Sequence, residues 1–261
     1  IFGYLLEWLY NGIGQNYGIA LILFTAILRI ILLPLTIKQQ KSMKKTTALQ
    51  GKMQEIQFKY KNNPELMNKE IMELYKRENL SPFSGCISSI VQILIILSVF
   101  YLVSRPLTYM KKIDPGIIEN YKNEISAEND GKISNYYEIE IIQKKAAQDE
   151  NIKVNMDFLG LDLSKVPSQN MSDATVYIIP LLYVVSSIFS IRMTTGKTKK
   201  KEGSNSSEPD MTQQMNKSMS YMMPIMAVSI AFVAPLGLAL YWLVSNILMI
   251  LERIVINKYV D

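Results

Sequence analysis

Four long stretches almost without charge dominate this sequence. They cover residues 18–37, 84–104, 174–191 and 218–251, and the only charged residue within them is Arg29. A helix needs about 20 mainly apolar residues to cross the hydrocarbon core of a membrane. A soluble domain rarely contains even one such stretch, so the sequence predicts an all-α polytopic membrane protein.

The last stretch is too long for a single crossing. As one helix, residues 218–251 would extend roughly 50 Å, whereas the hydrocarbon core is about 30 Å thick. Pro235 and Gly237 interrupt the stretch, and both residue types favour a break. We therefore expect two spans, 218–234 and 235–256, which bring the total to five; a single kinked helix is the alternative.

The distribution of lysine and arginine predicts the orientation, because cytoplasmic loops carry an excess of these residues. Loop 38–83 carries ten basic and five acidic residues, and segment 192–217 carries six basic and three acidic residues. Segment 105–173 carries nine basic and twelve acidic residues. We therefore expect both basic segments in the cytoplasm, the N-terminus outside and the C-terminal tail 257–261 inside.

Two segments beside the spans have amphipathic or aromatic patterns. Residues 1–17 are short, apolar and aromatic, which suits an external helix lying in the membrane interface. Loop 38–83 carries two apolar stripes at helical spacing, separated by a break at residues 62–64. This pattern predicts a cytoplasmic hairpin of two amphipathic helices whose lysines favour anionic headgroups. A solvated hairpin that merely links two spans is the alternative.

The remaining segments are polar. Residues 105–173 are expected to form an external loop or a small subdomain, in which residues 136–142 alternate like a strand. Residues 192–217 have the composition of a flexible cytoplasmic linker.

The amino-acid composition argues against several kinds of functional site. The chain contains no histidine and a single cysteine, Cys86. An internal disulfide, the usual catalytic triads and the common histidine or cysteine metal sites therefore lack their residues. No glycine-rich phosphate loop is present either. We expect no enzyme activity, no cofactor, no metal and no sequence-specific binding of nucleic acid.

Arg29 is costly where it stands, because a charge deep in a membrane costs a few kcal/mol unless it faces water or partners. The uncharged runs hold no aspartate or glutamate, so the sequence suggests an arginine without an acidic partner in a hydrated groove. Further polar or aromatic residues at one-turn spacing could line that groove: Thr25, Ser88, Gln92, Ser186, Ser190, Trp242 and Asn246. The alternative is that such residues only hold the helices together.

Methionines lie along one side of the predicted fourth span. Met215, Met219, Met222 and Met226 stand at i, i+4, i+7 and i+11, and Met223 lies next to this stripe. Methionine is flexible and polarizable, and it suits surfaces that accept varied partners. The pattern predicts a hydrophobic slide for substrate helices, with ordinary lipid-facing or packing methionines as the alternative.

Five motifs of the chain carry a resemblance to known proteins: TAILRIILLPLTIKQQKSMKK, LQGKMQEIQFKYKNNPELMNKEIMELYK, SPFSGCISSIVQ, FLGLDLS and PLGLALYWLVSNILMI. Together they resemble the YidC/Oxa/Alb family of membrane protein insertases. The resemblance implies a hydrophilic groove among five spans, open to the cytoplasm and to lipid, in which Arg29 is the functional arginine. It also implies the bacterial plasma membrane and the five-span form of Gram-positive-type bacteria. The chain departs from the family pattern at Gly51, Ser88, Leu94 and Ser190.

The function expected from this resemblance is membrane protein insertion and assistance in folding, without covalent chemistry. Arg29 would give an acidic substrate tail a transient counter-charge in the groove. The expected partners are nascent membrane proteins and the lipid bilayer, and the ribosome and the Sec translocon stay open as further partners. Two alternatives stay open: a small anion transporter or channel, and a structural subunit of a Sec-type translocon.

Overall fold

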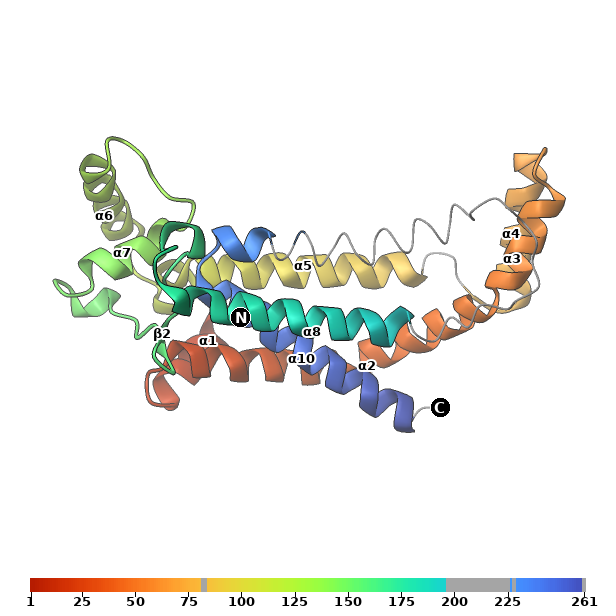
Figure 1. Ribbon diagram of the computed structural model, residues 1–261, viewed down its shortest axis with the longest axis horizontal. Helices are drawn as coiled ribbons and strands as arrows, with labels where there is room; N and C mark the ends of the chain where they lie inside the picture. The colour runs from red at the N-terminus through yellow and green to blue at the C-terminus, as the bar shows by residue number, and fades with distance from the viewer. Residues whose placement is uncertain (81–83, 196–225, 227–228, 260–261) are drawn as a thin grey trace.

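The computed structural model describes residues 1–80, 84–195, 226 and 229–259. Four long helices lie side by side along its longest axis (Figure 1). They are α2 (Tyr17–Ala48), α5 (Ser84–Ser104), α8 (Ile178–Thr195) and α10 (Leu236–Tyr259). Helix α10 packs against both α2 and α8, and α2 also packs against α5. The described part of the chain is mostly helical, as the sequence predicts.

Three of the described helices are long and apolar enough to cross a membrane, judged by length and composition. Their candidate spans are Tyr17–Thr46, Ala174–Met193 and Leu236–Lys258. In α5, the residues Ile90–Ser104 form an apolar helix that is shorter than these three candidate spans. Most of the predicted span 218–234 lies outside the described residues, so the number of five spans stays a prediction.

Helix α2 is longer than the first predicted span. It continues through Pro34 and ends at Ala48, whereas the span was expected to end at residue 37. Proline removes one backbone donor from a helix, and here the helix persists on both sides of it. The stretch that begins at Lys38 is therefore an extension of the first apolar helix rather than a separate one.

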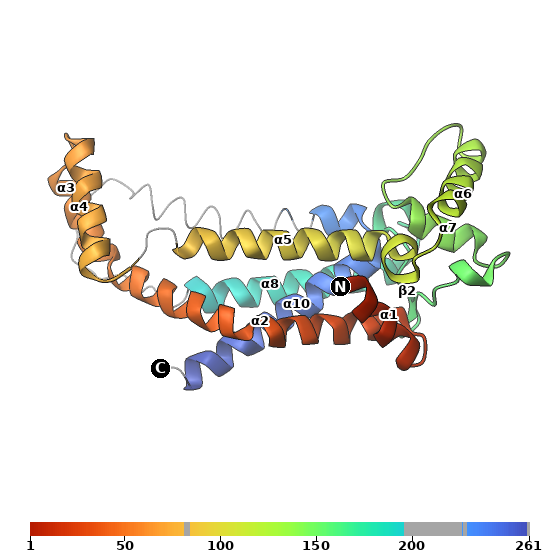
Figure 2. The ribbon, with the colours of Figure 1, turned by 180° about the vertical axis from the view of Figure 1, so that it is seen from behind.

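The predicted hairpin follows α2 and consists of α3 (Gln50–Lys59) and α4 (Pro64–Arg77). The side chain of Asn63 accepts a hydrogen bond from the backbone N–H of Leu66 at 3.2 Å, and Pro64 opens α4. This N-cap explains why the chain breaks where the sequence predicts it. Lys52 and Glu78 join the two arms at 2.9 Å. The hairpin lies at the opposite end of the molecule from α6 and α7 (Figure 2).

Gly51 provides a test of the hairpin. It lies in the first turn of α3, and a Cβ atom added there would have no atom within 4 Å. Alanine favours a helix over glycine by up to about 1 kcal/mol. We expect Gly51→Ala to slow amide hydrogen exchange in residues 50–59 by up to about fivefold. Exchange at α4 serves as the internal reference, and faster exchange in α3 would contradict the expectation.

Segment 105–173 is folded as a small subdomain. Its helices are a π-helix, η1 (Leu107–Lys111), α6 (Pro115–Glu128) and α7 (Tyr137–Lys145), with the 3-10 turns η2 (Glu150–Ile152) and η3 (Pro167–Gln169). Its strands are β1 (Asp157–Phe158) and β2 (Leu161–Asp162), and a further 3-10 turn, η4 (Ala174–Tyr177), follows the segment and leads into α8. Helix α7 packs against α6. The strands pair antiparallel, with Phe158 opposite Leu161.

The expectation of a strand at residues 136–142 is wrong, because most of this segment lies in α7. The alternating pattern does not reflect a sheet with one solvated face. Glu138, which the pattern assigns to a polar face, is completely buried and accepts hydrogen bonds from the backbone N–H and the hydroxyl of Thr108, at 2.9 and 2.6 Å. Burial raises the pKa of Glu138, and the Thr108 hydrogen bonds oppose that shift. A polar side chain here faces the interior.

The subdomain holds the first turns of two long helices. The backbone N–H of Tyr17 donates to the carbonyl of Asn155 at 3.0 Å. The N–H groups of Leu236 and Gly237 donate to the carbonyls of Lys165 and Leu163, at 2.9 and 2.8 Å. Helices leave their first N–H groups without internal partners, so these bonds fix where α10 begins.

An ion pair of 2.8 Å joins Lys165 of the subdomain to Asp173, the residue directly before η4. Asp173 also accepts from the N–H and hydroxyl of Thr175, and these contacts, with Lys165 first, lower the pKa of Asp173 to about 2. A carboxyl whose pKa falls on folding stabilises the protein above its unfolded pKa, near 4. That stabilisation disappears as the pH falls toward 2.

We therefore expect Asp173→Asn to lower the thermal unfolding temperature at neutral pH. The difference from the wild type should shrink as the pH falls from about 4 to 2. Fluorescence-detected melting in detergent over this pH range would measure it. Because both side chains are about one third exposed, added salt should also reduce the difference. A difference that stays constant with pH would show that the effect does not arise from the charge of Asp173.

The core lies where the long helices meet the subdomain and the short first helix, α1 (Phe2–Gly12). Fully buried side chains there come from distant parts of the chain: Leu6, Tyr17, Leu21, Phe24, Leu107, Met110, Leu163, Leu236 and Leu238. Large apolar side chains of α8 are exposed instead, among them Leu181, Leu182 and Val185. Exposed apolar surface of this kind suits contact with lipid.

Candidate functional site: a paired arginine inside the helix bundle

Arg29 points from α2 toward α10 and makes two polar contacts there. Its Nη2 donates a hydrogen bond to the Ser245 hydroxyl at 2.7 Å. Its Nη1 lies 3.7 Å from a carboxylate oxygen of Glu252. The Arg29 and Glu252 side chains are only 16% and 12% exposed. The guanidinium is thus held between a hydroxyl and a carboxylate.

The expectation that Arg29 lacks an acidic partner is wrong. Glu252 lies just beyond the uncharged run that ends at Leu251, but α10 continues to Tyr259 without a break. Because α10 packs along α2, the first charge after the run is brought to the arginine. Pairing reduces the cost of placing Arg29 in an apolar bundle.

The depth of the pair follows from the helix geometry. Both helices begin at the same level, because a Cβ on Gly237 would lie 3.5 Å from the ring of Tyr17. At the standard helical rise, Arg29 is roughly 18 Å along α2 and Glu252 roughly 22 Å along α10 from these points. Both helices run away from the subdomain (Figure 2). Glu252 therefore lies on the side of Arg29 that is farther from the subdomain.

A small pocket opens beside the arginine. Thr25, Leu28, Arg29, Leu32, Gln92, Ile95, Tyr241 and Ser245 line it. Its volume of about 10 Å³ has room for about one water molecule. Among the predicted groove residues, the structure brings Thr25, Gln92 and Arg29 to this pocket. The Thr25 hydroxyl donates to the carbonyl of Leu21 at 2.6 Å, so its hydrogen atom is already used within α2.

Ser186 and Asn246 lie in a different contact, between α8 and α10. The Asn246 amide nitrogen donates to the hydroxyls of Ser186 and Ser187, at 2.9 and 3.2 Å. This geometry matches the alternative that such residues hold helices together. Trp242 packs beside the hydrophobic core. Neither Ser186, Asn246 nor Trp242 lines the pocket at Arg29.

Other predicted site residues are only partly placed. Ser190 lies on α8, one turn beyond Ser186. Ser88 belongs to α5, but its side chain is outside the described part of the structure. Met226 is 56% exposed. The other three predicted slide residues, Met219, Met222 and Met223, lie outside the described residues.

Three residues around Arg29 are absent from the predicted site: Tyr241, Ser245 and Glu252. They stand at i, i+4 and i+11, so one face of α10 carries them all. This spacing is visible in the sequence. All three residues lie within the predicted span 235–256, but the sequence alone does not show that this face of the span meets Arg29.

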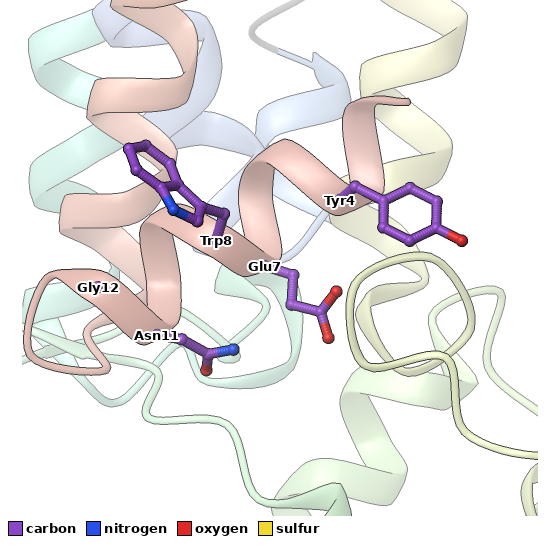
Figure 3. A pocket seen from close by; sticks show the side chains of 5 residues that line it. All are labelled: Tyr4, Glu7, Trp8, Asn11 and Gly12. Atoms are coloured by element: carbon purple, nitrogen blue, oxygen red, sulfur yellow. The ribbon is translucent and has the colours of Figure 1, made fainter.

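A second hollow, on α1, differs in character from the pocket at Arg29. Figure 3 shows its lining: Tyr4, Glu7, Trp8, Asn11 and Gly12. It is open and about 520 Å³ in volume. Lys112 already pairs with Glu7, and its ammonium lies 3.6 Å from the centre of the Tyr4 ring. The exposed Tyr4 and Trp8 rings fit the predicted interfacial helix.

The described residues contain no group of three or more acidic or cysteine side chains arranged to hold a metal ion. The polar chemistry of the site is therefore that of a guanidinium, a carboxylate, hydroxyls and an amide. Such groups can bind a carboxylate and exchange hydrogen bonds.

Comparison with known proteins gives a consistent result. Residues 8–261 match the family model described as 60Kd inner membrane protein. The chain is 29% identical over 243 residues to the membrane protein insertase YidC of Treponema denticola, covering 93% of this chain and 34% of that protein. It is 28% identical to the membrane protein insertase YidC of Oceanobacillus iheyensis, covering 99% of this chain and 82% of that protein.

The chain thus spans about a third of the length of the Treponema protein. A solved structure, described as an active YidC insertase with its first transmembrane domain resolved, superposes with a TM-score of 0.53 at 20% identity. The similarity covers 97% of this chain and 44% of that one. At this level of identity, the comparison supports a shared fold.

Proposed function

Because the chain belongs to the 60Kd inner membrane protein family of YidC insertases, we propose that it inserts transmembrane helices into the membrane and helps them to fold. It is a multi-pass membrane protein of this family. The observation that carries the proposal is a largely buried guanidinium, Arg29, beside a small pocket that polar side chains line in part, inside an apolar bundle. A purely structural bundle has little reason to retain such a charge.

The proposed mechanism requires no covalent step. A substrate helix gains several tenths of a kcal/mol for each Leu, Ile, Phe or Val that leaves water for lipid. The polar tail that must cross the membrane forms the barrier. A polar groove that reaches partway into the bundle shortens the apolar path. Arg29 offers the tail a counter-charge at the deepest point, and the membrane potential pulls acidic groups outward.

The proposed orientation places the N-terminus outside and the α3–α4 hairpin and C-terminus in the cytoplasm. Its support is the excess of basic residues in 38–83 and 192–217. The hairpin and the subdomain also lie at opposite ends of the molecule (Figure 1). Under this proposal a substrate tail approaches Arg29 from the hairpin end, and the lysines of the hairpin contact anionic lipid.

The remaining parts of the proposal concern the substrate path. The five spans, including 218–234, surround the groove. Gln92, Thr25 and Ser88 belong to its lining, and Ser186, Ser190, Trp242 and Asn246 support the wall formed by α8 and α10. Met219, Met222, Met223 and Met226 form a slide for the apolar part of the substrate. The partners are nascent membrane proteins and the bilayer.

Reconstitution tests the function. The purified chain in liposomes is expected to make a single-span substrate protease-resistant in its translocated tail, whereas empty liposomes do not. Liposomes containing an unrelated polytopic protein control for membrane disturbance. Equal protection in all three preparations would contradict insertase activity. Selective anion flux without insertion would favour a transporter instead.

A further inference from the structure

The two contacts of Arg29 differ in quality. Its bond to Ser245 is a short hydrogen bond of 2.7 Å, whereas its 3.7 Å contact with Glu252 exceeds hydrogen-bond length. The Glu252 oxygen in that contact is buried, and it has no hydrogen-bond partner among the described residues. Ser245 therefore orients the guanidinium, whereas Glu252 lies near the guanidinium without a hydrogen bond to it.

An incompletely satisfied carboxylate in a bundle is an expensive feature. A buried charge is tolerated when it is paired and fully hydrogen-bonded, and each missing hydrogen bond leaves the desolvation cost of that group uncompensated. If the only requirement were to neutralise Arg29, a carboxylate hydrogen-bonded to the guanidinium would be more stable. The loose geometry leaves the pair easy to separate by another carboxylate.

We propose that Glu252 is an internal competitor that occupies Arg29 until an acidic group of a substrate tail displaces it. This inference rests on the proposed insertase function. The side chain of Glu252 carries the same group as aspartate and glutamate in a tail, so the two can exchange at one guanidinium. The substrate class is a helix whose translocated tail contains at least one carboxylate.

The position of Glu252 fits this role. It lies beyond Arg29 on the side away from the subdomain, because its position along α10 is farther from the start of the helix than that of Arg29 along α2. A tail that enters from the hairpin end reaches Glu252 before it reaches the guanidinium. Displacement then costs only the loose contact, since Ser245 continues to hold the arginine. Competition from Glu252 also weakens the binding of the substrate tail to Arg29. When the tail leaves, Glu252 returns to the guanidinium.

Peptide binding in nanodiscs tests the competition directly. Two synthetic single-span peptides differ only in two tail positions, which are aspartate in one and asparagine in the other. The variants are Glu252→Gln, which removes the charge, and Glu252→Asp, which keeps it. The matched control is Glu150→Gln, because Glu150 is 94% exposed in the subdomain and undergoes the same change of charge.

Glu252→Gln is expected to raise the affinity for the acidic peptide relative to the neutral one by about fivefold. Glu252→Asp and Glu150→Gln should keep the wild-type ratio. Because both peptides bind the same sample, partial unfolding of a variant lowers both signals and leaves the ratio intact. An unchanged ratio in Glu252→Gln would overturn the proposal, whether neither affinity changes or both change by the same factor.

The same variants in the liposome assay separate this inference from the proposed function. If wild-type protein inserts no substrate, the insertase function fails, while the binding ratio still decides whether Glu252 competes for Arg29. If wild-type protein inserts substrates and the ratio does not respond to Glu252→Gln, the competitor proposal fails alone.

Discussion

Arg29→Ala is expected to slow insertion of a substrate with an acidic tail by about tenfold. Under the proposed mechanism, the tail loses its counter-charge at the deepest point of the path, where a partly desolvated charge pair is worth about 1.4 kcal/mol or more. Arg29→Lys should retain most of the rate, because it keeps the positive charge. Protease protection in proteoliposomes, with tails that carry zero, one or two acidic residues, measures the effect.

Arg29→Ala also leaves Glu252 buried without its cation, which can destabilise the bundle on its own account. The double variant Arg29→Ala/Glu252→Gln removes both charges and is the appropriate control. It should fold better than the single variant and still discriminate poorly between acidic and neutral tails. Equal insertion of every tail by the wild type, Arg29→Lys and the double variant would remove the charge from the mechanism.

The long helices could be predicted because their signal is local. Residues 174–191, for example, are apolar over a length that only a membrane or a large core can bury, and α8 covers most of that stretch. The helix break after residue 233 is equally local: a bend occurs at Ala234, and α10 begins after Pro235. The cap at Asn63 follows from short-range chemistry too.

The Arg29–Glu252 pair was missed for a different reason. The two residues are more than 200 positions apart, and only the packing of α10 on α2 brings them together. The expectation of an unpartnered arginine considered only the uncharged runs, although the predicted span 235–256 already contains Glu252. The strand expected at residues 136–142 failed because one buried carboxylate, Glu138, mimics an alternating polar face. Periodicity alone does not distinguish a buried polar residue from a solvated one.

Gly18→Ala is expected to destabilise the fold by about 1–3 kcal/mol. Gly18 lies in the first turn of α2, and an added Cβ would come within 2.5–2.7 Å of Phe158 ring and Cβ atoms. Because the Phe158 Cβ is among them, rotating the ring is not enough and β1 must move. That movement strains the hydrogen bond from Asn16 to the carbonyl of Asp157, which is 2.7 Å long.

Thermal unfolding in detergent measures this effect, with a decrease of roughly 2–4 °C for each kcal/mol. Gly12→Ala is the matched control, because a Cβ at Gly12 would meet no atom within 4 Å; its effect should stay within about 0.5 kcal/mol. In a Phe158→Gly background, Gly18→Ala should cost much less, since both the overlapping ring and the overlapping Cβ atom are gone. An undiminished cost would place the effect in the backbone of α2 instead. The close approach of β1 to α2 would then not be what requires glycine at this position.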